Sequence, residues 1–357
     1  MTSLTTTTTT TATATTTTDP IDSNWPPFYN QLHQQYICQL SKNTESYEYQ
    51  VTEHLRLSGM YWGYTAMALL QSEHLMNPDD IVAFVMSGYK YDETTQTGGW
   101  AGNLGHDVHL LYTTSAIQIL AIADQLQLLD QDNRKESIVK YITSLQQKDG
   151  SFAGDQWLEI DTRFSYCAML SLVILNRLDA VDVAASNTFI TSCQNFDGGY
   201  GCVPGAESHA GQIFCCVGAL SIGNGLDFID RDQLGWWLAE RQCDSGGLNG
   251  RPEKQADVCY SWWVLSVLAI LDRLEWIDKT KLIGFILKCQ NEIEGGIADR
   301  PGDEADVFHT FFGICGLSFL GYLDNTNHKH MNVNPTFAMP VDVVERLGLK
   351  CQTYFGK

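Results

Sequence analysis

Residues 194–216, QNFDGGYGCVPGAESHAGQIFCC, contain the unit that decides the fold: a glycine turn that leads into a very apolar stretch. Four other stretches carry the same kind of turn, QTGGW, QKDGSF, CDSGGL and EIEGGI. The turns are separated by 52, 48, 48 and 49 residues, counted between Gly99, Ser151, Gly199, Gly247 and Gly296. A regular spacing of this length indicates an architecture built from structural repeats.

Each repeat is predicted to be a helical hairpin. Apolar runs with helical spacing follow the turns, such as SAIQILAIADQLQLL at 115–129, and more polar runs such as DRDQLGWWLAERQ at 230–242 come later in the unit. Two helices of about 12–15 residues, with their loops, fill such a period. A helix that is apolar nearly all round must be buried, whereas its amphipathic partner can face water.

Stacked hairpins of this kind form either an open superhelix or a closed ring, and about six of them fit between residues 45 and 340. The apolar helices have no polar face to present to the groove of a superhelix. We therefore predict an all-α fold, an α–α barrel of about six hairpins with an inner and an outer ring of helices. An open solenoid that serves as a non-catalytic scaffold is the alternative that the periodicity leaves open.

The composition limits the partners and the location of the chain. Acidic residues outnumber basic ones by 42 to 22, a net charge of −20, which argues against nucleic-acid binding and adhesion to an anionic membrane surface. No apolar run reaches ~18 residues, so no membrane span is expected. Eleven cysteines without a secretory signal indicate reduced thiols in a cytoplasmic protein. We predict a disordered Thr-rich tail at 1–20 and a single barrel domain at 21–357.

The repeat also places polar residues at one position, the start of each apolar helix. In the first four repeats, the residue ten positions after Gly99, Ser151, Gly199 or Gly247 is His109, Asp161, His209 or Asp257, respectively. Arg163 closely follows the second of these, Cys259 follows the fourth, and His309 lies thirteen residues after Gly296. In a closed ring these helix starts converge on one mouth, so we expect their side chains to face a common cavity.

Asp257, Cys259 and His309 offer a carboxylate, a thiolate and an imidazole from adjacent hairpins. Three protein ligands without a fourth Cys or His in the pattern are typical of a catalytic zinc site that keeps one position open. Taken singly, each residue has an ordinary structural explanation: a core thiol, a histidine at a helix end and an N-cap. Their common position in the repeat favours the metal site.

A basic cluster lies beside this predicted metal site in the otherwise acidic chain. The stretch GLNGRPEK supplies Arg251 and Lys254, and His209 adds a donor from the preceding repeat. Arginine binds phosphate oxygens as a planar fork and lysine binds them as a point charge. Tyr260 can hydrogen-bond a diphosphate, although Lys254 can also be an ordinary surface charge. Aromatic residues that could line an apolar cavity, or simply fill the core, are Tyr112, Trp262, Trp263 and Phe308.

Zinc, an anion clamp and an aromatic cavity together suit one kind of reaction. A thiol that a zinc ion deprotonates attacks an allylic carbon and expels diphosphate. Aromatic faces shield the carbocation-like centre, and Arg251, Lys254 and His209 neutralise the leaving group. A terpene cyclase would need a DxDD or DDxxD motif, and the nearest match, Asp79-Asp80, lacks the third acid. An (α/α)-barrel glycosidase would leave Cys259 and His309 without a role.

Long stretches resemble a known family. GGLNGRPEKQADVCYSWWVL, GGIADRPGDEADVFHTFFGICGLSFLG, PGAESHAGQIFCC, QKDGSFAGDQWLEIDTRFSYC and RLSGMYWGYT are similar to the β subunits of protein prenyltransferases, most of all those of Rab geranylgeranyltransferase (type II). The resemblance extends from about residue 45 to 340 and implies an α–α barrel with a central active site. It implies zinc ligation by Asp257, Cys259 and His309, and diphosphate binding by His209, Arg251, Lys254 and Tyr260. The isoprenoid pocket implied by the resemblance consists of Ser58, Tyr112, Ala210, Gly211, Ser261, Trp262, Trp263 and Phe308.

Ser58 indicates the length of the isoprenoid. Farnesyltransferases carry a tryptophan at this position, and a serine leaves room for another five-carbon unit, so the resemblance implies a geranylgeranyl (C20) donor. Asp299 matches the position at which the farnesyl enzyme binds Mg²⁺, and Arg163 is a further candidate site residue. Two departures from the family pattern lie near the site, Thr114 for a leucine and Val307 for a proline.

The resemblance also implies partners. The family works as a heterodimer with an α subunit, and the type II enzyme modifies C-terminal cysteines of Rab GTPases that an escort protein presents. The donor is geranylgeranyl diphosphate, and neither nucleic acid nor membrane insertion is expected. The alternatives are the β subunit of a type I geranylgeranyltransferase or of a farnesyltransferase and, from a different class, the non-catalytic scaffold.

Overall fold

The computed structural model describes residues 25–40, 42, 45 and 47–354, and most of these residues are helical. The Thr-rich tail expected at residues 1–20 lies outside the described residues. Within the described segments, no helix is long and apolar enough to cross a membrane.

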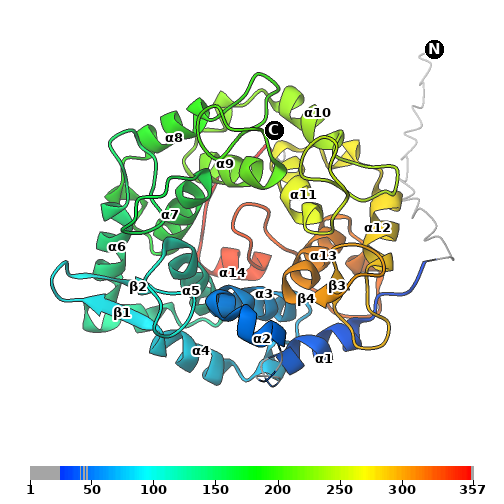
Figure 1. Ribbon diagram of the computed structural model, residues 1–357, viewed down its shortest axis with the longest axis horizontal. Helices are drawn as coiled ribbons and strands as arrows, with labels where there is room; N and C mark the ends of the chain where they lie inside the picture. The colour runs from blue at the N-terminus through cyan, green and yellow to red at the C-terminus, as the bar shows by residue number, and fades with distance from the viewer. Residues whose placement is uncertain (1–24, 41, 43–44, 46, 355–357) are drawn as a thin grey trace, which may run out of the picture.

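The inner ring follows from the very apolar helices of the repeat. Each inner helix packs against the next, and the last packs against the first, so that the ring closes (Figure 1). In the described part of the chain the inner helices are α3 (Arg56–Leu69), α5 (Leu110–Ile122), α7 (Thr162–Ile174), α9 (Ala210–Ile222), α11 (Tyr260–Leu271) and α13 (Val307–Phe319). The closure of α13 on α3 confirms the predicted α–α barrel and excludes the open solenoid.

The outer ring is formed by the helices with one polar face. It consists, within the described residues, of α1 (Asn30–Leu40), α4 (Pro78–Ser87), α6 (Arg134–Ser144), α8 (Val183–Ser192), α10 (Arg231–Ala239) and α12 (Lys279–Lys288). Shorter helices are α2 (Tyr47–Val51), α14 (Val341–Arg346), and the 3₁₀ segments η1 (Glu53–Leu55), η2 (Glu73–Met76), η3 (Leu126–Asn133), η4 (Leu178–Ala180), η5 (Leu226–Phe228), η6 (Leu274–Trp276) and η7 (Leu323–Asn325). The paired inner and outer helices are the hairpins that the period predicts.

The glycine turns connect five of the outer helices, α4, α6, α8, α10 and α12, to the next inner helix. Gly198 has a φ of +86°, in the left-handed region that favours glycine. A Cβ at Gly150 would lie 2.1 Å from the carbonyl oxygen of Ala185, so this close contact requires glycine. Two antiparallel strand pairs that the sequence did not indicate occur beside such turns, β1 (Tyr89–Asp92) with β2 (Thr97–Trp100) and β3 (Ile297–Ala298) with β4 (Ala305–Asp306).

The C-terminal segment closes one end of the barrel. Its backbone N–H groups donate to the last turns of inner helices, from Met331 to Leu69 O at 2.8 Å and from Gln352 to Ser221 O at 2.8 Å. Tyr354 N–H donates in the same way to Ile270 O at 3.1 Å. Figure 1 shows α14 and its flanking loops inside the outline of the ring. The opposite end, where the inner helices begin, is left as the mouth.

A buried histidine joins the first and last repeats. His33 of α1 is fully buried, its Nδ1 accepts from Gly296 N–H at 2.9 Å, and its Nε2 lies 2.9 Å from Gln290 Oε1. Nε2 therefore carries the proton of the neutral ring and donates to the amide oxygen. Burial lowers the pKa of His33 to about 4, and the bond to Gln290 opposes this shift only in part.

This burial predicts an acid-sensitive fold. In the unfolded chain His33 is protonated below about pH 6.5, whereas in the folded chain it stays neutral until the pH falls to about 4. The stability contributed by the neutral ring is therefore complete above pH 6.5 and is lost as the pH falls toward 4. The loss by pH 5 is about 2 kcal/mol. Urea unfolding at pH 7.5 and 5.0 measures it, and His33→Gln is expected to remove this part of the pH dependence. An unchanged pH dependence in the variant would contradict the assignment.

Candidate active site

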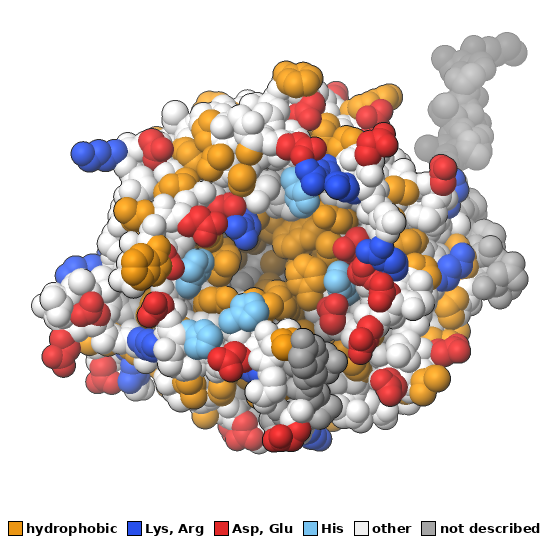
Figure 2. Space-filling view, in the orientation of Figure 1, with side chains coloured by type: hydrophobic (Ala, Val, Ile, Leu, Met, Phe, Trp, Pro, Cys, Tyr) orange, Lys and Arg blue, Asp and Glu red, His pale blue; other side chains and the backbone are white. Residues whose placement is uncertain are grey.

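The mouth of the barrel leads into a central hollow. Figure 2 shows hydrophobic side chains at the bottom of this hollow and histidine, acidic and basic side chains around its rim. The inner helices α5, α7 and α9 begin at the rim with a side-chain cap. The side chains of His109, Asp161 and His209 accept hydrogen bonds from the N–H two residues further on. Capping thus explains much of the polar pattern, and only additional contacts can identify a functional site.

The capping position is filled in the last repeat as well, by a residue that the sequence pattern had not singled out. Asp306 lies ten residues after Gly296 and caps α13, with its Oδ1 accepting from His309 N–H at 2.8 Å. The other carboxylate oxygen, Oδ2, lies 2.6 Å from His309 Nδ1. The ten-residue count that found the earlier caps would also have found Asp306.

Asp257, Cys259 and His309 come together as predicted. One donor atom from each residue lies within 4.8 Å of the other two, and His309 Nε2 is 3.2 Å from Asp257 Oδ1. Cys259 is buried at the start of α11, and its N–H donates to Asp257 Oδ1 at 2.7 Å. Among the described residues, no other group of three Cys, His or acidic side chains has this geometry.

The charges at this cluster favour a bound cation. Burial alone would raise the pKa of the Asp257 carboxyl, but hydrogen bonds from His309 and Cys259 hold it below its usual value. Burial opposes protonation of His309, yet the carboxylates of Asp257 and Asp306 raise its pKa to about 9. Burial, reinforced by Asp257, raises the pKa of the Cys259 thiol well above its usual value. The carboxylates of Asp257 and Asp306 thus stabilise a positive charge between them. The Cys259 thiol would ionise only with a positive charge close by.

The donor set fits a zinc ion. Zinc binds sulfur, imidazole nitrogen and carboxylate oxygen, and tetrahedral ligands at about 2.0–2.3 Å from the metal lie roughly 3.3–3.8 Å apart. The donors of Asp257, Cys259 and His309 reach this spacing by moving toward one another by roughly 1 Å or less. Asp306 holds Nδ1 of His309 and so directs Nε2 to the cluster, as carboxylates behind zinc-binding histidines do.

Asp306 is expected to support metal binding without being a ligand. In Asp306→Asn the amide oxygen still caps α13, but the acceptor for His309 Nδ1–H is lost, so the ring is less basic and less well oriented. We expect zinc affinity to fall about 10–100-fold with little change in thermal stability. Competition with a chromophoric chelator measures the affinity. Asp303→Asn, on the same loop and exposed, is the matched control and should bind zinc like the wild type.

The candidate anion-binding residues lie beside this cluster. His209 Nε2 is 3.2 Å from Tyr260 Oη, and His209 Nδ1 accepts from Gly211 N–H. Burial and the nearby Arg251 guanidinium lower the pKa of His209, so the ring is neutral with its proton on Nε2. Arg251 forms an ion pair with exposed Glu207, and Lys254 is exposed on the same loop. These residues present N–H and O–H donors at one side of the mouth.

Aromatic side chains form the wall of the hollow below these donors. The ring of Trp263 lies 5.2 Å from that of Phe214 and 4.8 Å from that of Phe312. Phe308 is 4.7 Å from Phe312 and 5.0 Å from Trp62. Tyr112 and Gly211 are partly exposed, and Ser58 of α3 is 9% exposed.

Three residues expected in the pocket lie behind its surface instead. Ala210 and Ser261 are completely buried, and Trp262 is 1% exposed. The Trp262 ring stacks on Phe312 and Phe319, so it packs between α11 and α13. Because these side chains have almost no free surface, they support the wall and do not offer contacts to a ligand.

The two remaining candidates are held by neighbouring charges. Arg163 donates from Nη2 to Asp161 Oδ2 at 2.9 Å, so it lies at the mouth at the start of α7. Asp299 accepts at Oδ2 from Arg300, from Nε at 2.8 Å and from Nη2 at 2.5 Å. Mg²⁺ could bind Asp299 only after this guanidinium moved away, so the Mg²⁺ role implied by the resemblance stays a prediction, and we assign magnesium no step.

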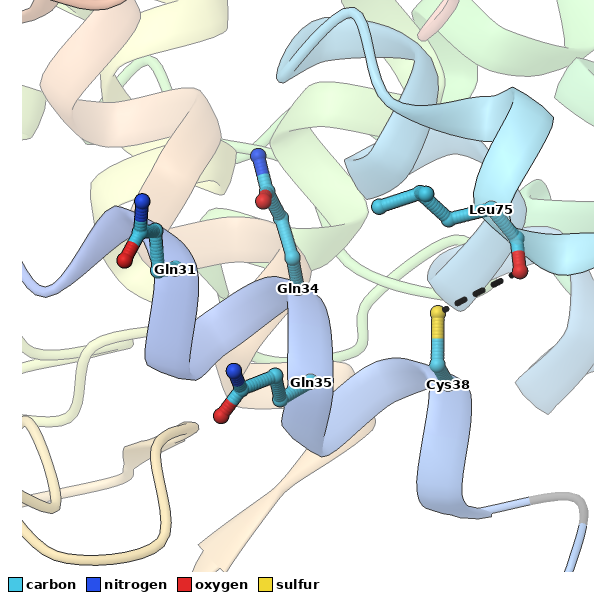
Figure 3. A pocket seen from close by; sticks show the side chains of 5 residues that line it. All are labelled: Gln31, Gln34, Gln35, Cys38 and Leu75. Carbon is cyan, nitrogen blue, oxygen red and sulfur yellow. Dashed lines mark hydrogen bonds between the residues drawn. The ribbon is translucent and has the colours of Figure 1, made fainter.

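A separate depression lies on the outside of the barrel, between α1 and η2 (Figure 3). Its lining consists of Gln31, Gln34, Gln35, Cys38 and Leu75. The Cys38 thiol donates to Leu75 O at 3.8 Å, and the other polar groups are neutral amides. The depression offers one thiol and neutral amides but no charged group, whereas the mouth of the barrel gathers acidic, basic and imidazole groups, so we take the central hollow as the candidate active site.

The closed double ring of helices and the polar mouth define the class to which the chain belongs. The family model "Prenyltransferase alpha-alpha toroid domain" matches residues 28–339, and the chain belongs to this family. The "Geranylgeranyl transferase type-2 subunit beta" of Saccharomyces cerevisiae is 50% identical over 321 residues, which cover 88% of this chain and 95% of that protein. A Dictyostelium discoideum protein named "Probable geranylgeranyl transferase type-2 subunit beta" is 51% identical, over 89% of this chain and 90% of its own.

A solved structure confirms the fold. The Candida albicans protein geranylgeranyltransferase-I, complexed with GGPP, superimposes with a TM-score of 0.80 at 20% identity, over 90% of this chain and 99% of that chain. The similarity in architecture therefore extends far beyond the similarity in sequence.

Proposed function

We propose that the chain is the catalytic β subunit of a zinc-dependent protein geranylgeranyltransferase of type II. It transfers a C20 group from geranylgeranyl diphosphate to C-terminal cysteines of Rab-type GTPases and forms a thioether. The observation that supports this most directly is the cluster of Asp257, Cys259 and His309 within 4.8 Å, beside the donors of His209 and Tyr260. The relatives of about 50% identity, which are named geranylgeranyl transferase type-2 subunit beta, support the choice of a geranylgeranyl donor.

The reaction joins a protein thiol to an allylic carbon. Asp257, Cys259 and His309 would hold a zinc ion, and its positive charge would favour the thiolate form of an acceptor cysteine placed beside it. The C–S bond forms at the first carbon of the isoprenoid while the C–O bond to diphosphate breaks. The electron pair of the broken bond leaves with the diphosphate, and the thiol proton goes to solvent.

The side chains of the mouth would neutralise the leaving group. His209 Nε2–H and Tyr260 Oη–H lie 3.2 Å apart and can both donate to diphosphate oxygens. Arg251 can exchange its exposed partner Glu207 for the diphosphate, because an exposed ion pair contributes only about 0–1 kcal/mol. Lys254 is exposed on the same loop and adds a positive charge. Stabilisation of charge that develops in the transition state is the main source of catalysis by such donors.

The cavity would take the isoprenoid chain. The rings of Trp263 and Phe308 offer an apolar wall near the metal cluster, and their faces stabilise a developing carbocation. Ser58 leaves space further inside for the fourth isoprene unit. We propose an α subunit as the partner and an escort protein as the carrier of the Rab substrate. The alternatives remain the β subunit of a type I geranylgeranyl- or farnesyltransferase and a scaffold without catalysis.

One reconstitution tests the proposal. The chain is purified with its α subunit and supplied with zinc, labelled C15 or C20 diphosphate, and either a Rab bound to escort protein or a short peptide with a C-terminal CaaX motif. Label from the C20 diphosphate should appear on the Rab and depend on the escort protein. Transfer to the CaaX peptide instead would support a type I or farnesyl enzyme, and no transfer to either acceptor would support the scaffold.

A further inference from the structure

The short hairpin of β3 and β4 bridges the segments that carry the three proposed metal ligands. Strand β4 ends with Asp306, whose carboxylate holds His309 through Nδ1. Strand β3 leads to Asp299, whose carbonyl oxygen accepts from Val258 N–H at 2.8 Å, directly before Cys259. The two strands pair with each other. The hairpin therefore connects the start of α11 with the start of α13, and a shift of the hairpin would move the ligands relative to one another.

The hairpin is fixed to the first turn of α13 by one buried hydroxyl group. Thr310 Oγ1 accepts from Ile297 N–H of β3 at 2.8 Å and donates to Asp306 O of β4 at 2.6 Å. Thr310 follows His309 in the chain and is completely buried. Because a buried polar group that loses its partner is unfavourable, the two strands and this turn are expected to move together. The position of the hairpin is thus transmitted to His309.

The other side of the hairpin is held by α1, from the opposite end of the chain. Tyr36 Oη donates to Ala305 O at 2.9 Å, and His33 Nδ1 accepts from Gly296 N–H at 2.9 Å. Gly296 leaves room for the tyrosine, because a Cβ there would lie 2.9 Å from Tyr36 Cε1 and 2.8 Å from Ala305 Cβ. The residue before β3 and the first residue of β4 are therefore both bonded to the same outer helix.

Of these two contacts, that of Tyr36 lies nearer to the metal cluster along the chain. Its acceptor is the carbonyl of the planar peptide group that joins Ala305 to Asp306, so the hydrogen bond restrains the orientation of this peptide. The carboxylate of Asp306 has to reach two groups of His309, the backbone N–H and Nδ1. A change in the peptide plane would misdirect this carboxylate and, through it, the imidazole.

We propose that Tyr36 is a positioning residue of the metal site and acts through Asp306 on His309. This inference rests on the proposed function and deepens it, because it adds a residue outside the mouth to the parts that the metal site needs. The helix α1 belongs to the outer ring and contributes no ligand. The cluster reaches its full affinity for zinc only when the first helix of the barrel is docked on the last repeat.

The test compares Tyr36→Phe with Tyr354→Phe in the full chain purified with its α subunit. Both variants lose a hydroxyl that donates to a backbone carbonyl, and that of Tyr354 donates to Leu226 O at 3.0 Å, at the closed end of the barrel. Tyr36→Phe should lower zinc affinity about 3–10-fold, less than the roughly 10–100-fold typical of a residue bonded to the ligand itself. Tyr354→Phe should bind zinc like the wild type. Competition with a chromophoric chelator measures the affinity.

Cobalt(II) bound in place of zinc gives a second readout, which reports the geometry of the site. Its visible d–d bands are strongest in tetrahedral coordination, so they should weaken in Tyr36→Phe and stay unchanged in Tyr354→Phe. The melting temperature should fall by similar small amounts in both variants, since each loses one hydrogen bond of the same kind. A purely structural role of Tyr36 would change the melting temperature and leave the cobalt spectrum as it is.

Each outcome decides the proposal. Unchanged zinc affinity and an unchanged cobalt spectrum in Tyr36→Phe would overturn it. An equal loss of affinity in Tyr354→Phe would overturn it as well, because the effect would then come from a general loosening of the barrel. The proposed function fails separately, if the folded wild type binds no zinc at all.

Discussion

The chain purified with its α subunit is expected to contain about one zinc ion, and the Cys259→Ala variant almost none, because only two ligands remain. Transfer activity should fall on the order of 10³-fold or more, since a metal contributes several kcal/mol to such a transition state. Cys259 is the ligand whose removal should matter most, because its sulfur is the softest donor of the three. Zinc content by atomic emission and transfer of labelled isoprenoid measure the two effects.

Cys216→Ala is the matched control for this variant. Cys216 is a fully buried thiol on the inner helix α9, and it lies outside the metal cluster. Both variants lose a buried sulfur, so a general loss of packing would affect them alike. Cys216→Ala should keep its zinc. A zinc-free wild type that is fully folded, or a Cys259→Ala variant that retains the metal, would contradict the assignment.

The barrel could be predicted from the sequence because the same local signals, a glycine turn and an apolar helix, occur five times. Glycine turns at a constant spacing, followed by helices without a polar face, leave the buried ring as the consistent arrangement. The contacts that attach the two ends of the chain to the ring could not be predicted in this way. His33 with Gln290, and residues 331–354 with the ends of the inner helices, join distant segments that carry no repeat pattern. Such pairings depend on tertiary packing, which periodicity does not contain.

The site could be predicted in part for the same reason. The metal cluster lies at a position that the repeat defines, so counting along the chain located Asp257, Cys259 and His309. Asp306 lies at the same ten-residue position in the last repeat, but the pattern does not single it out because His309, three residues further on, is the more typical metal ligand. The ten-residue position also holds residues with a structural role, since His109 and Asp161 are helix caps.

The side of a helix that a residue faces was harder to predict. Ser261, Trp262 and Trp263 are consecutive, so their side chains point in directions about 100° apart. Trp263 keeps part of its surface exposed, whereas Ser261 and Trp262 are buried against α13 and its neighbours. On a helix that is apolar on every side, the sequence does not distinguish the face toward the cavity from the face toward the next helix.

The Ser58→Trp variant is expected to change the preferred donor from C20 to C15. An indole in place of the hydroxymethyl group would occupy the space between α3 and α5 that the fourth isoprene unit needs. Five buried carbons contribute about 0.8 kcal/mol each, roughly 4 kcal/mol in all, so the ratio of kcat/KM for C20 to that for C15 should fall about 10³-fold. Competition between differently labelled diphosphates measures this ratio directly.

Ser58→Ala separates volume from the loss of the hydroxyl group. Alanine is as small as serine, so this variant should keep the preference for C20, and the shift in Ser58→Trp can then be assigned to the indole. Ser58→Trp should lower the upper limit of the donor length to C15. An unchanged donor preference in Ser58→Trp would place the end of the isoprenoid elsewhere in the cavity.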